Sequence, residues 1–526
     1  MNPAALLDAL RNPACFPHAP HRVQVVQTHL SIVCLADELV FKLKKARTLP
    51  FVDFAPLDAR RGFCREEVRL NRRLCPDTYL GTCSLRSGTG GDGVRFAAIG
   101  DDDGPDDLDV AVVMRRLPQE RMLDELLRVH TVHAAELETL ACLVAAFHAT
   151  AERSPAVRAL GAPERLAQFA CDNFTELAAI ADHGLPPGLL TALARATEHD
   201  FQRLLPMLRE RADRGLVVDG HGDLHCRNIC MTAPPTVYDC IEFAPAFRCG
   251  DVATENAFLV MDLRYRGAPA LAAAYERAYM AASGDTEQAA LLPTLGSYRA
   301  MVRAKVAVFA SGEVELPAVD RAAARDSARR HLLLAAAMAL EARGPLWIVV
   351  FGPPASGKST LCQALAALAG WPHFATDVVR KELAGLPTTE RARAEHYTPE
   401  FTARTYAELA ARATTASVNG APVVLLDGNF AVPEQRAELR PPAGTTVLFA
   451  VVQVDAVTAA ARAAQRASEP GHTSDADAHI TTVRHAAFAT PEPAEGLRLV
   501  TLDGQLATPG LVATTLQQML DRTSCN

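Results

Sequence analysis

The 526-residue sequence has few lysines, only two tryptophans, and no hydrophobic run near the ~18 residues that a membrane-spanning helix needs. Its first residues, MNPAALLDALRNPACFP, lack the basic start and apolar stretch of a secretory signal. The 13 cysteines follow no disulfide-framework spacing, which is typical of reduced thiols. A net charge of −8 weighs against a protein that coats nucleic acid or an anionic membrane. We therefore expect a soluble cytoplasmic protein of two to four domains, at about 150 residues per domain.

Lysine is so scarce that each one attracts attention. Of 53 basic residues only six are lysines: Lys42, Lys44, Lys45, Lys305, Lys358 and Lys381. Since arginine serves elsewhere, a lysine hints that a compact ammonium group is needed at its position.

The pattern of apolar residues changes twice along the chain. Residues 1–110 show strand-like runs at 23–35, 39–44 and 79–113 with a helix at 64–74, and the acidic run 101–109 is expected to be a solvated turn. Residues 120–312 are mainly helical, apart from a strand-like hairpin at 216–243, and a further helix at 318–342 ends at Arg343-Gly-Pro. Strands then alternate with helices, which predicts a parallel sheet flanked by helices. The predicted domains are 1–312 and 344–526, joined by a helical linker, 313–343.

The second region opens with a phosphate loop. The segment from Gly352 to Ser359, GPPASGKS, matches G-x-x-x-x-G-K-[ST] between a buried strand, LWIVVF, and a helix. Gly352 and Gly357 allow the backbone to wrap phosphate, Lys358 adds positive charge, and Ser359 is a candidate Mg²⁺ ligand.

Other polar residues follow the strands of this region. Asp377 is expected at the end of a probable strand, HFATD, and is a candidate general base for an attacking hydroxyl, with Arg380 gripping the acceptor. Asp427 ends the strand PVVLLD and is a candidate to hold Mg²⁺ through water. Arg462 and Arg466 are spaced to close over the phosphates, although a solvated helix face explains their spacing equally well.

The segments GPPASGKST, TDVVRKELAG, VVLLDGNF and RAAQR…TSDAD resemble the P-loop small-molecule and polynucleotide kinases, a group also called AAA-type ATPases. The resemblance covers roughly residues 346–500. It implies that Asp377 is the general base, that Arg380 is the arginine of the D-x-x-R motif, and that Thr360 belongs to the phosphate loop. Residues 344–526 carry a net charge of about −3, which favours a small hydroxyl acceptor over a nucleic-acid track.

A second phosphoryl-transfer motif lies in the first region. His221-Gly-Asp223-Leu-His-Cys-Arg-Asn228 is followed by Asp239, so that one hairpin carries a candidate base and two candidate metal ligands. Lys42 lies on a strand of the first hairpin, and Glu67 lies in the following helix, where it can pair with that lysine.

Together with VFKLKK, REEVRLNRRL, MRRLP and YDCIEF, this motif resembles the aminoglycoside phosphotransferase family over residues 23–312. The resemblance implies a two-lobed, protein-kinase-like α+β fold. It also implies that Asp223 is the catalytic base, that Asn228 and Asp239 bind Mg²⁺, and that Lys42 contacts nucleotide phosphates. Lys44, on the same strand face, is the rival phosphate lysine. Val113 and Met114 would lie at the hinge beside adenine.

The cysteines and histidines around the HGDLHCRN motif also permit a zinc site, but their spacing is not that of a zinc finger, and small core thiols are the preferred interpretation. His148 is expected to be a buried core histidine, Glu255 a brace of the loop, and Lys305 a helix-surface charge.

The resulting hypothesis is a fused ATP-dependent phosphotransferase with two Mg·ATP sites that phosphorylates hydroxyl groups of a small molecule, without nucleic-acid or membrane partners. Two alternatives stay open. In one, the N-terminal domain senses nucleotide without turnover and controls the P-loop domain; in the other, the P-loop domain couples ATP hydrolysis to assembly.

Overall fold

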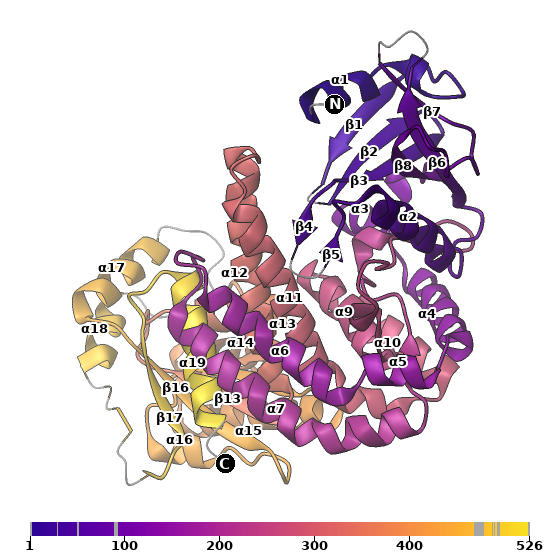
Figure 1. The fold of residues 1–526 in the computed structure, drawn as a ribbon. Helices are drawn as coiled ribbons and strands as arrows, with labels where there is room; N and C mark the ends of the chain where they lie inside the picture. Colours follow the sequence, from indigo (N-terminus) through magenta and orange to yellow (C-terminus); the bar gives the residue numbers. More distant parts are fainter. Residues whose placement is uncertain are drawn as a thin grey trace. The chain divides into compact units, whose positions relative to one another are not determined.

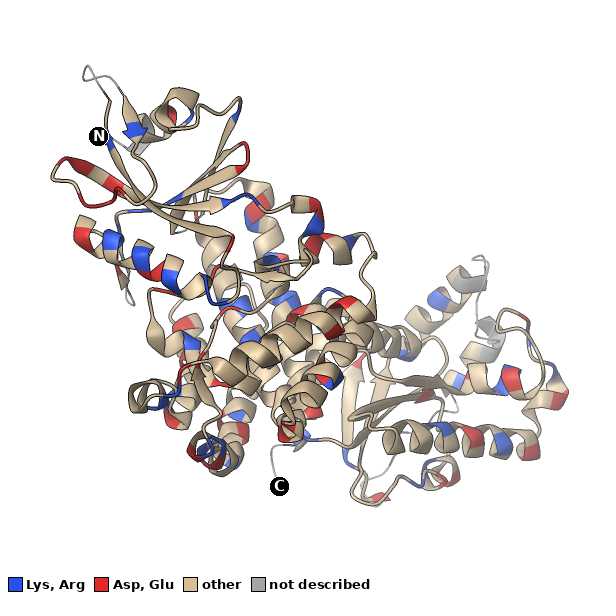
Figure 2. Cartoon of the chain, turned by 90° about the vertical axis from the view of Figure 1, so that its right-hand side faces the viewer, with Lys and Arg blue, Asp and Glu red and all other residues tan. Residues whose placement is uncertain are grey.

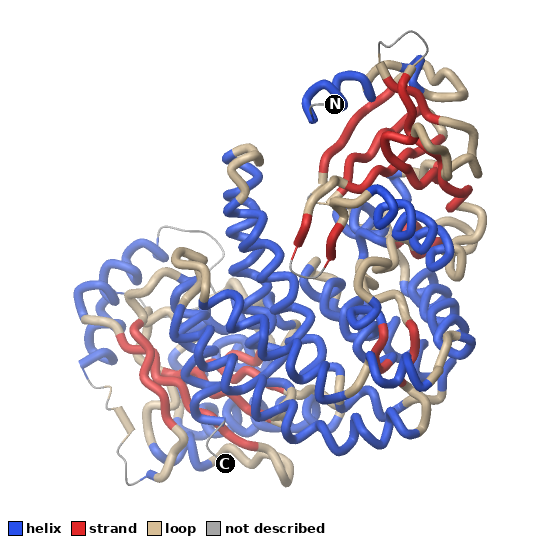
Figure 3. The backbone as a smooth tube through the Cα atoms, viewed as in Figure 1, coloured by secondary structure: helices blue, strands red, loops and turns tan. Residues whose placement is uncertain are grey.

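The computed structural model describes residues 3–523 except 29, 50–51, 89–92, 468–477, 487, 489 and 492–494. By its internal contacts the chain forms two compact units (Figure 1). Unit 1 comprises residues 1–166 and 206–288, and unit 2 comprises 167–205 and 289–526. Figure 3 shows that most strands of each unit gather into one main sheet, while helices make up most of the rest.

Unit 1 begins with a six-stranded antiparallel sheet in the order β1-β2-β3-β8-β6-β7. Its strands are β1 (Val23–Gln27), β2 (Ser31–Ala36), β3 (Leu39–Lys44), β6 (Tyr79–Ser87), β7 (Val94–Phe96) and β8 (Asp107–Arg115). The predicted hairpin is confirmed as β2 and β3, which turn at Asp37 in a left-handed backbone conformation with φ 50°. The predicted run 23–35 is two strands, since β1 and β2 pair with each other.

The two faces of this sheet bury different side chains because residues alternate along each strand. Phe41 and Leu43 of β3 pack with Leu10 and Phe16 from the N-terminal segment, which contains α1 (Pro3–Leu10) and η1 (Pro13–Cys15). Val40 faces the opposite side with Cys64 and Val68 of α2 (Leu57–Asn71). Lys42 and Lys44 alternate with Phe41 and Leu43, so they share the α2 side with Val40.

The acidic run 101–109 is a solvated turn only in part: Asp101, Asp103 and Asp106 are exposed, whereas β8 begins at Asp107. Asp102 and Asp107 are each 9% exposed. Asp102 receives two hydrogen bonds from Arg65 of α2, both at 2.9 Å, and Asp107 forms an ion pair with Arg86 at 2.8 Å. Arginines far away in sequence neutralise these carboxylates, a pairing that local composition does not reveal.

The rest of unit 1 is a helical lobe with short strand pairs around its central loops. Its helices are η2 (Gln119–Arg121), α3 (Leu123–Arg128), α4 (Ala134–Thr150), α5 (Pro155–Leu160), η3 (Cys226–Asn228), α8 (Pro245–Arg248), α9 (Val252–Tyr265), α10 (Pro269–Ser283) and η4 (Thr286–Ala290). The short strands are β4 (Thr48–Leu49) with β5 (Val52–Asp53), β9 (Val217–Asp219) with β12 (Cys249–Asp251), and β10 (Ile229–Cys230) with β11 (Thr236–Val237). The predicted hairpin at 216–243 is therefore mostly loop, with two-residue strands at its centre.

Two long helices each have residues in both units: α6 (Pro163–Ala178) and α7 (Pro187–Asp213). Among the described residues, no single helix has the length and apolar composition of a membrane span. One bent pair, formed by 134–150 and 155–178, passes that test only when its two parts are taken together.

Unit 2 contains a five-stranded, fully parallel sheet in the order β14-β15-β13-β16-β17. Its strands are β13 (Leu346–Phe351), β14 (His373–Ala375), β15 (Val423–Gly428), β16 (Thr446–Gln453) and β17 (Leu499–Asp503). Every residue of β13 is buried, as expected for a central parallel strand covered on both faces. The predicted fold class is thus confirmed in both regions: an antiparallel sheet with a helical lobe, followed by an α/β domain with a parallel sheet.

The helices of unit 2 that follow residue 289 are α11 (Leu292–Gly312), α12 (Ala318–Glu341), α13 (Lys358–Ala369), α14 (Thr376–Leu383), η5 (Ala394–Tyr397), α15 (Pro399–Val418), α16 (Pro433–Ala437), α17 (Ala456–Ala467), α18 (Ala478–Ala486) and α19 (Thr508–Thr523). The predicted linker includes α12, whose second half is buried and whose Glu341 accepts a 2.7 Å hydrogen bond from the indole of Trp371. The limits of the two compact units therefore do not coincide with the predicted boundaries at 312 and 343. Figure 2 shows acidic and basic residues interspersed along the helices.

Candidate functional site

The first candidate site, in unit 1, is built around Lys42 on β3. Its Nζ lies 2.8 Å from Glu67 Oε1 on α2 and 2.6 Å from Asp239 Oδ1, a residue 197 positions away in the sequence. Asp239 has φ 63°, a left-handed conformation that aspartate tolerates better than most side chains. Burial disfavours the charged ammonium, but Asp239 and Glu67 outweigh it and raise the pKa of Lys42 well above its usual value.

Lys44 lies two residues after Lys42 on the same face of β3 and is more deeply buried than Lys42. It contacts Glu67 Oε2 at 2.7 Å and Glu242, so Glu67 bridges the two lysines. Burial opposes ionisation of Glu67, yet the two ammonium groups lower its pKa to about 2. Burial instead raises the pKa of Glu242, despite the neighbouring Lys44. Sequence reasoning missed Glu242, although it lies in the YDCIEF segment already singled out.

The candidate base Asp223 is held from two sides. Asn228 donates from Nδ2 to the Asp223 carboxylate and to its backbone carbonyl, both at 3.0 Å. His225 Nε2 lies 3.3 Å from the same carboxylate. The side chain of Asp223 keeps about a third of its surface exposed, at 32%, so the carboxylate is oriented without being enclosed.

A buried carboxylate holds the loop that carries Asp223. Glu255 of α9 accepts hydrogen bonds from the backbone N–H groups of His221 and Gly222, the latter at 2.6 Å. His148 Nε2 lies 2.8 Å from Glu255, and His148 Nδ1 lies 2.7 Å from the hydroxyl of Tyr279. His148 is thus a buried core histidine and Glu255 a brace, as expected. Burial opposes the charge on Glu255, but hydrogen bonding to His148 and the loop amides lowers its pKa to about 2.

Backbone geometry explains why the loop needs its glycine. Gly222 has φ 82°, and a Cβ there would lie 2.9 Å from the Cα of Arg248. The cysteines of this region, Cys226, Cys230, Cys240 and Cys249, are buried. Within the described part of the chain they do not converge with histidines or carboxylates into a metal-binding group, which agrees with small core thiols.

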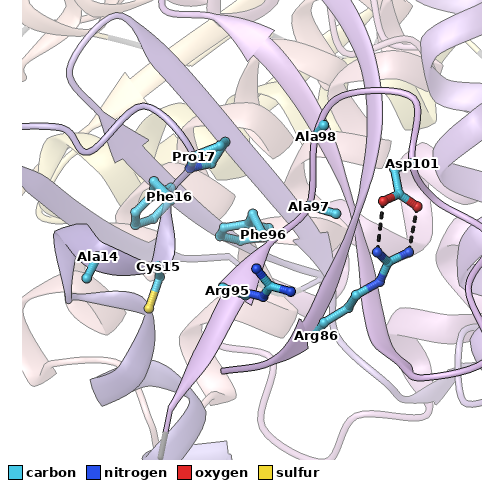
Figure 4. Close-up of a pocket in the computed structure, with 10 residues that line it drawn as sticks. All are labelled: Ala14, Cys15, Phe16, Pro17, Arg86, Arg95, Phe96, Ala97, Ala98 and Asp101. Carbon is cyan, nitrogen blue, oxygen red and sulfur yellow. Dashed lines mark hydrogen bonds and ion pairs between the residues drawn. The ribbon is translucent and has the colours of Figure 1, made fainter. Parts of the chain in front are cut away.

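A hollow also opens on the opposite face of the N-terminal sheet (Figure 4). Phe16 and Phe96 line it together with Arg86, which is already paired with Asp101 at 2.8 Å and with Asp107. Lys42 faces the other side of this sheet, so the hollow is separate from the candidate site.

The second candidate site, in unit 2, is the loop between β13 and α13. Gly352 has φ 148°, and a Cβ there would lie 2.4 Å from the carbonyl oxygen of Val452, so only glycine fits. Gly357, with φ 101°, lies immediately before Lys358, which starts α13. Ser359 and Thr360 follow in its first turn and are exposed. The loop thus presents backbone N–H groups at a helix N-terminus, the arrangement that binds phosphate.

Contacts around the loop keep its shape. Lys358 Nζ donates to the carbonyl of Pro353 at 3.2 Å. Arg462 of α17 donates to the carbonyls of Ser356, at 3.4 Å, and Gly504, at 2.8 Å, so it lies beside the loop where a phosphate-closing arginine is expected. The side chain of Arg466 lies outside the described residues.

The remaining candidates of this unit gather near the carboxyl ends of the strands. Asp427 is the penultimate residue of β15, the strand next to β13 in the sheet. Asp377 lies in the first turn of α14, two residues after β14, and not at a strand end as expected. Burial raises the pKa of Tyr406 to about 12, and the charges of Arg380, Asp377 and Asp427 all act on its phenol.

Arg380 is 6% exposed and already engaged. It donates to the carbonyl of His396 at 2.6 Å and lies over the ring of Tyr397, with its guanidinium carbon 4.6 Å from the ring centroid. Its predicted role with the acceptor stays a prediction, since these contacts show it holding η5.

Comparisons with known proteins fit the two-part organisation. A family model described as an AAA domain matches residues 347–491. Among curated proteins, "Uncharacterized protein Rv2004c" of Mycobacterium tuberculosis (strain ATCC 25618 / H37Rv) is 30% identical over 465 residues, which cover 87% of this chain and 88% of the relative. A Mycobacterium bovis relative, "Uncharacterized protein Mb2027c", matches to the same extent.

Solved structures with similarity include a choline/ethanolamine kinase family protein from Mesorhizobium loti, at 13% identity and a TM-score of 0.37, covering 64% of this chain and 94% of that one. A gluconokinase from Sinorhizobium meliloti is 20% identical with a TM-score of 0.25, covering 34% of this chain and 93% of that one. At these TM-scores neither structure decides a function. The match along most of both sequences does decide kinship: the chain belongs to the protein family represented by the Mycobacterium tuberculosis protein Rv2004c.

Proposed function

We propose that the protein is a fused ATP-dependent phosphotransferase with two Mg·ATP sites, one in each unit, acting on hydroxyl groups of a small molecule. The observation that carries the proposal is the position of Lys42, whose ammonium group joins Glu67 and Asp239 across 197 residues of sequence. A lysine fixed by a helix glutamate, next to a metal-binding aspartate, is the arrangement by which kinases hold nucleotide phosphates.

In unit 1 the donor set fits a magnesium-bound nucleotide. Asp239 keeps 43% of its side chain exposed and Asn228 offers an amide oxygen, and oxygen ligands of this kind suit Mg²⁺. When bound, Mg·ATP supplies the phosphoryl group. Asp223, oriented by Asn228 and His225, would take the proton from the acceptor hydroxyl. Lys42 is the preferred phosphate lysine, because Lys44 is enclosed by Glu67 and Glu242 with 2% of its side chain exposed.

In unit 2 the loop from Gly352 to Gly357 would cradle phosphate through its backbone amides, with Lys358 adding charge. Ser359 and Asp427 would hold Mg²⁺, directly or through water. The fit is supported by Asp427 Oδ1, a buried carboxylate oxygen without a hydrogen-bond partner in the described part of the chain. Asp377 would accept the proton of the acceptor hydroxyl, and Arg462 would close over the phosphates.

The test is an acceptor screen of the full chain with Mg·ATP, read by mass spectrometry. Asp223→Asn and Asp377→Asn keep side-chain size but cannot accept a proton, so each should lower phosphorylation at its own site by roughly 10²-fold or more. The double variant should form no phosphorylated product. Arg404→Ala, which changes an exposed helix residue, is the control for unrelated damage.

The same measurements distinguish the proposed function from its two alternatives. If Asp223→Asn leaves every product unchanged while Asp239→Ala alters activity at the P-loop, unit 1 is a nucleotide sensor and the two-site proposal is wrong. If no acceptor is phosphorylated but ATP is hydrolysed in proportion to protein concentration, the P-loop unit is an assembly-coupled ATPase.

A further inference from the structure

We propose that Cys362, His373 and Asp427 form a binding site for a thiophilic divalent cation of the Zn²⁺ class beneath the phosphate loop. The three residues come from α13, β14 and β15, and their ligand atoms all lie within 4.8 Å of one another. No sequence pattern suggested this group, because its members are 11 and 54 residues apart and share no motif.

The spacing suits a tetrahedral ion. Zn–N and Zn–O bonds of about 2.0–2.2 Å place two ligand atoms of one ion roughly 3.5 Å apart. His373 Nε2 and Asp427 Oδ2 are already 3.6 Å apart. The backbone holds them there, because β14 and β15 pair in parallel with His373 opposite Leu425 and Ala375 opposite Asp427. The Cys362 Sγ lies within 4.8 Å of the other two ligand atoms and is the third ligand of the proposed site.

Two buried polar atoms of the group lack partners among the described residues. Asp427 Oδ1 and His373 Nε2 each have no hydrogen bond, and the side chain of Asp427 is only 3% exposed. A buried polar atom without a partner costs about 1–3 kcal/mol, more when it carries charge. A cation bound by the His373 imidazole and by both oxygens of the Asp427 carboxylate would satisfy both atoms.

The chemistry of the donors selects the class of ion. One thiolate, one imidazole and one carboxylate favour Zn²⁺ and its analogue Co²⁺, whereas Mg²⁺ prefers oxygen ligands and bound water. On binding, the sulfur–hydrogen bond of Cys362 breaks, its proton passes to the buffer, and a sulfur–metal bond forms; no oxidant or reductant is needed.

The site has a consequence for the phosphate loop. Cys362 follows Lys358 by four residues on α13, so the two share one helix face. Asp427 is assigned to both Zn²⁺ and the Mg²⁺ ion of the loop, so the two ions should compete for its carboxylate. Zn²⁺ should therefore inhibit turnover at this loop, a consequence that rests on the proposed function, whereas metal binding does not.

The experiment titrates the metal-free, reduced full chain with Co²⁺ in the absence of nucleotide. We expect a thiolate-to-cobalt charge-transfer band and the visible absorption of tetrahedral Co²⁺, both removed by one equivalent of Zn²⁺. His373→Gln and Cys362→Ser should each weaken Co²⁺ binding by at least tenfold, as loss of a ligand requires. Cys142→Ser, which removes an exposed thiol on α4, is the matched control and should bind as the unchanged chain does.

A Co²⁺ spectrum without the thiolate band, or one that His373→Gln leaves unchanged, would overturn the proposal. If Cys362→Ser fails to fold, His373→Gln carries the test, because His373 is half-buried at the first residue of the short strand β14. If the chain binds Co²⁺ through Cys362 but phosphorylates no acceptor, the metal site stands and the proposed function is wrong. If it phosphorylates an acceptor but does not bind Co²⁺ through Cys362, the proposed function stands and the metal site is wrong.

Discussion

The two candidate sites are built from different parts of the protein. In unit 1, side chains from three distant segments neutralise one another: Lys42 and Lys44 from β3, Glu67 from α2, and Asp239 with Glu242 from the loop before α8. In unit 2, one stretch of six residues supplies the phosphate cradle through its backbone, shaped by Gly352 and Gly357. The first site is thus a buried network of charges, and the second a local backbone structure.

This difference has an energetic consequence. Removing one member of a buried charge network leaves its partners charged and unpaired, which costs stability. Removing a side chain from a backbone cradle leaves the fold intact and costs ligand binding or rate. The following experiments test that contrast, beginning with the largest expected effect.

Lys44→Met should destabilise unit 1 by about 3–5 kcal/mol, because Glu242 and one oxygen of Glu67 lose their buried partner. Urea denaturation of the full chain, combined with hydrogen exchange in α2 and β3, measures the loss. Lys305→Met is the matched control: its partner Glu176 keeps 49% of its side chain exposed, so we expect less than about 1 kcal/mol. Equal losses in the two variants would show that the buried network does not stabilise the fold.

Lys358→Ala should leave stability nearly unchanged and lower turnover at the phosphate loop by over roughly 10²-fold, which corresponds to about 3 kcal/mol of transition-state stabilisation. The measurement is ATP consumption in an Asp223→Asn background, so that only the loop contributes. Lys305→Ala serves as the control. Unchanged turnover in Lys358→Ala would remove the phosphate-loop assignment.

Glu255, which holds the loop of Asp223, should make the stability of unit 1 sensitive to acid. The pKa of Glu255 is about 2 in the folded chain against an ordinary value of 4.5, so its contribution is complete above about pH 4.5 and is lost as the pH falls toward 2. Between pH 6 and pH 3 this group should account for a fall of about 2 kcal/mol in the free energy of unfolding.

Glu255→Gln keeps an acceptor for the loop amides but cannot titrate. Its free energy of unfolding should therefore fall less than that of the unchanged chain over the same pH range, as urea denaturation at pH 6 and pH 3 would show. Identical pH slopes in the two chains would contradict the assignment of the charge to Glu255.

Arg462→Ala should have the smallest effect of the four. Its hydrogen bonds reach only the carbonyls of Ser356 and Gly504 at the border of the loop, and losing them should weaken nucleotide binding by about fivefold, or ~1 kcal/mol. Calorimetric Mg·ATP binding in the Asp239→Ala background isolates this site, with the exposed Arg404→Ala as control. Unchanged Mg·ATP binding in Arg462→Ala would contradict the proposal that Arg462 closes over the phosphates.

Sequence reasoning succeeded where the signal is local. The parallel sheet of unit 2, the glycine loop and the helix at 318–342 follow from apolar runs and turn residues within a few positions of one another. The pairing of Lys42 with Glu67 was also foreseen, because a strand and the next helix lie close in sequence.

It failed where the signal is long-range. The acidic run 101–109 reads as a turn, yet arginines of α2 bury two of its carboxylates. Glu242, 198 residues from Lys44 in the sequence, contacts the ammonium group of that lysine, and no local pattern indicates this contact.

The sequence by itself determined the two-part organisation, the phosphate loop and the identity of the polar residues that could serve phosphoryl transfer, since short motifs and apolar periodicity encode local backbone structure. Only the tertiary structure decided which charges meet: that Glu67 bridges two lysines, that Glu255 holds the loop of Asp223, and that Cys362 reaches His373 and Asp427. The physical reason is that a charge is stabilised by whatever group folding brings within a few ångströms, and sequence distance does not measure that separation.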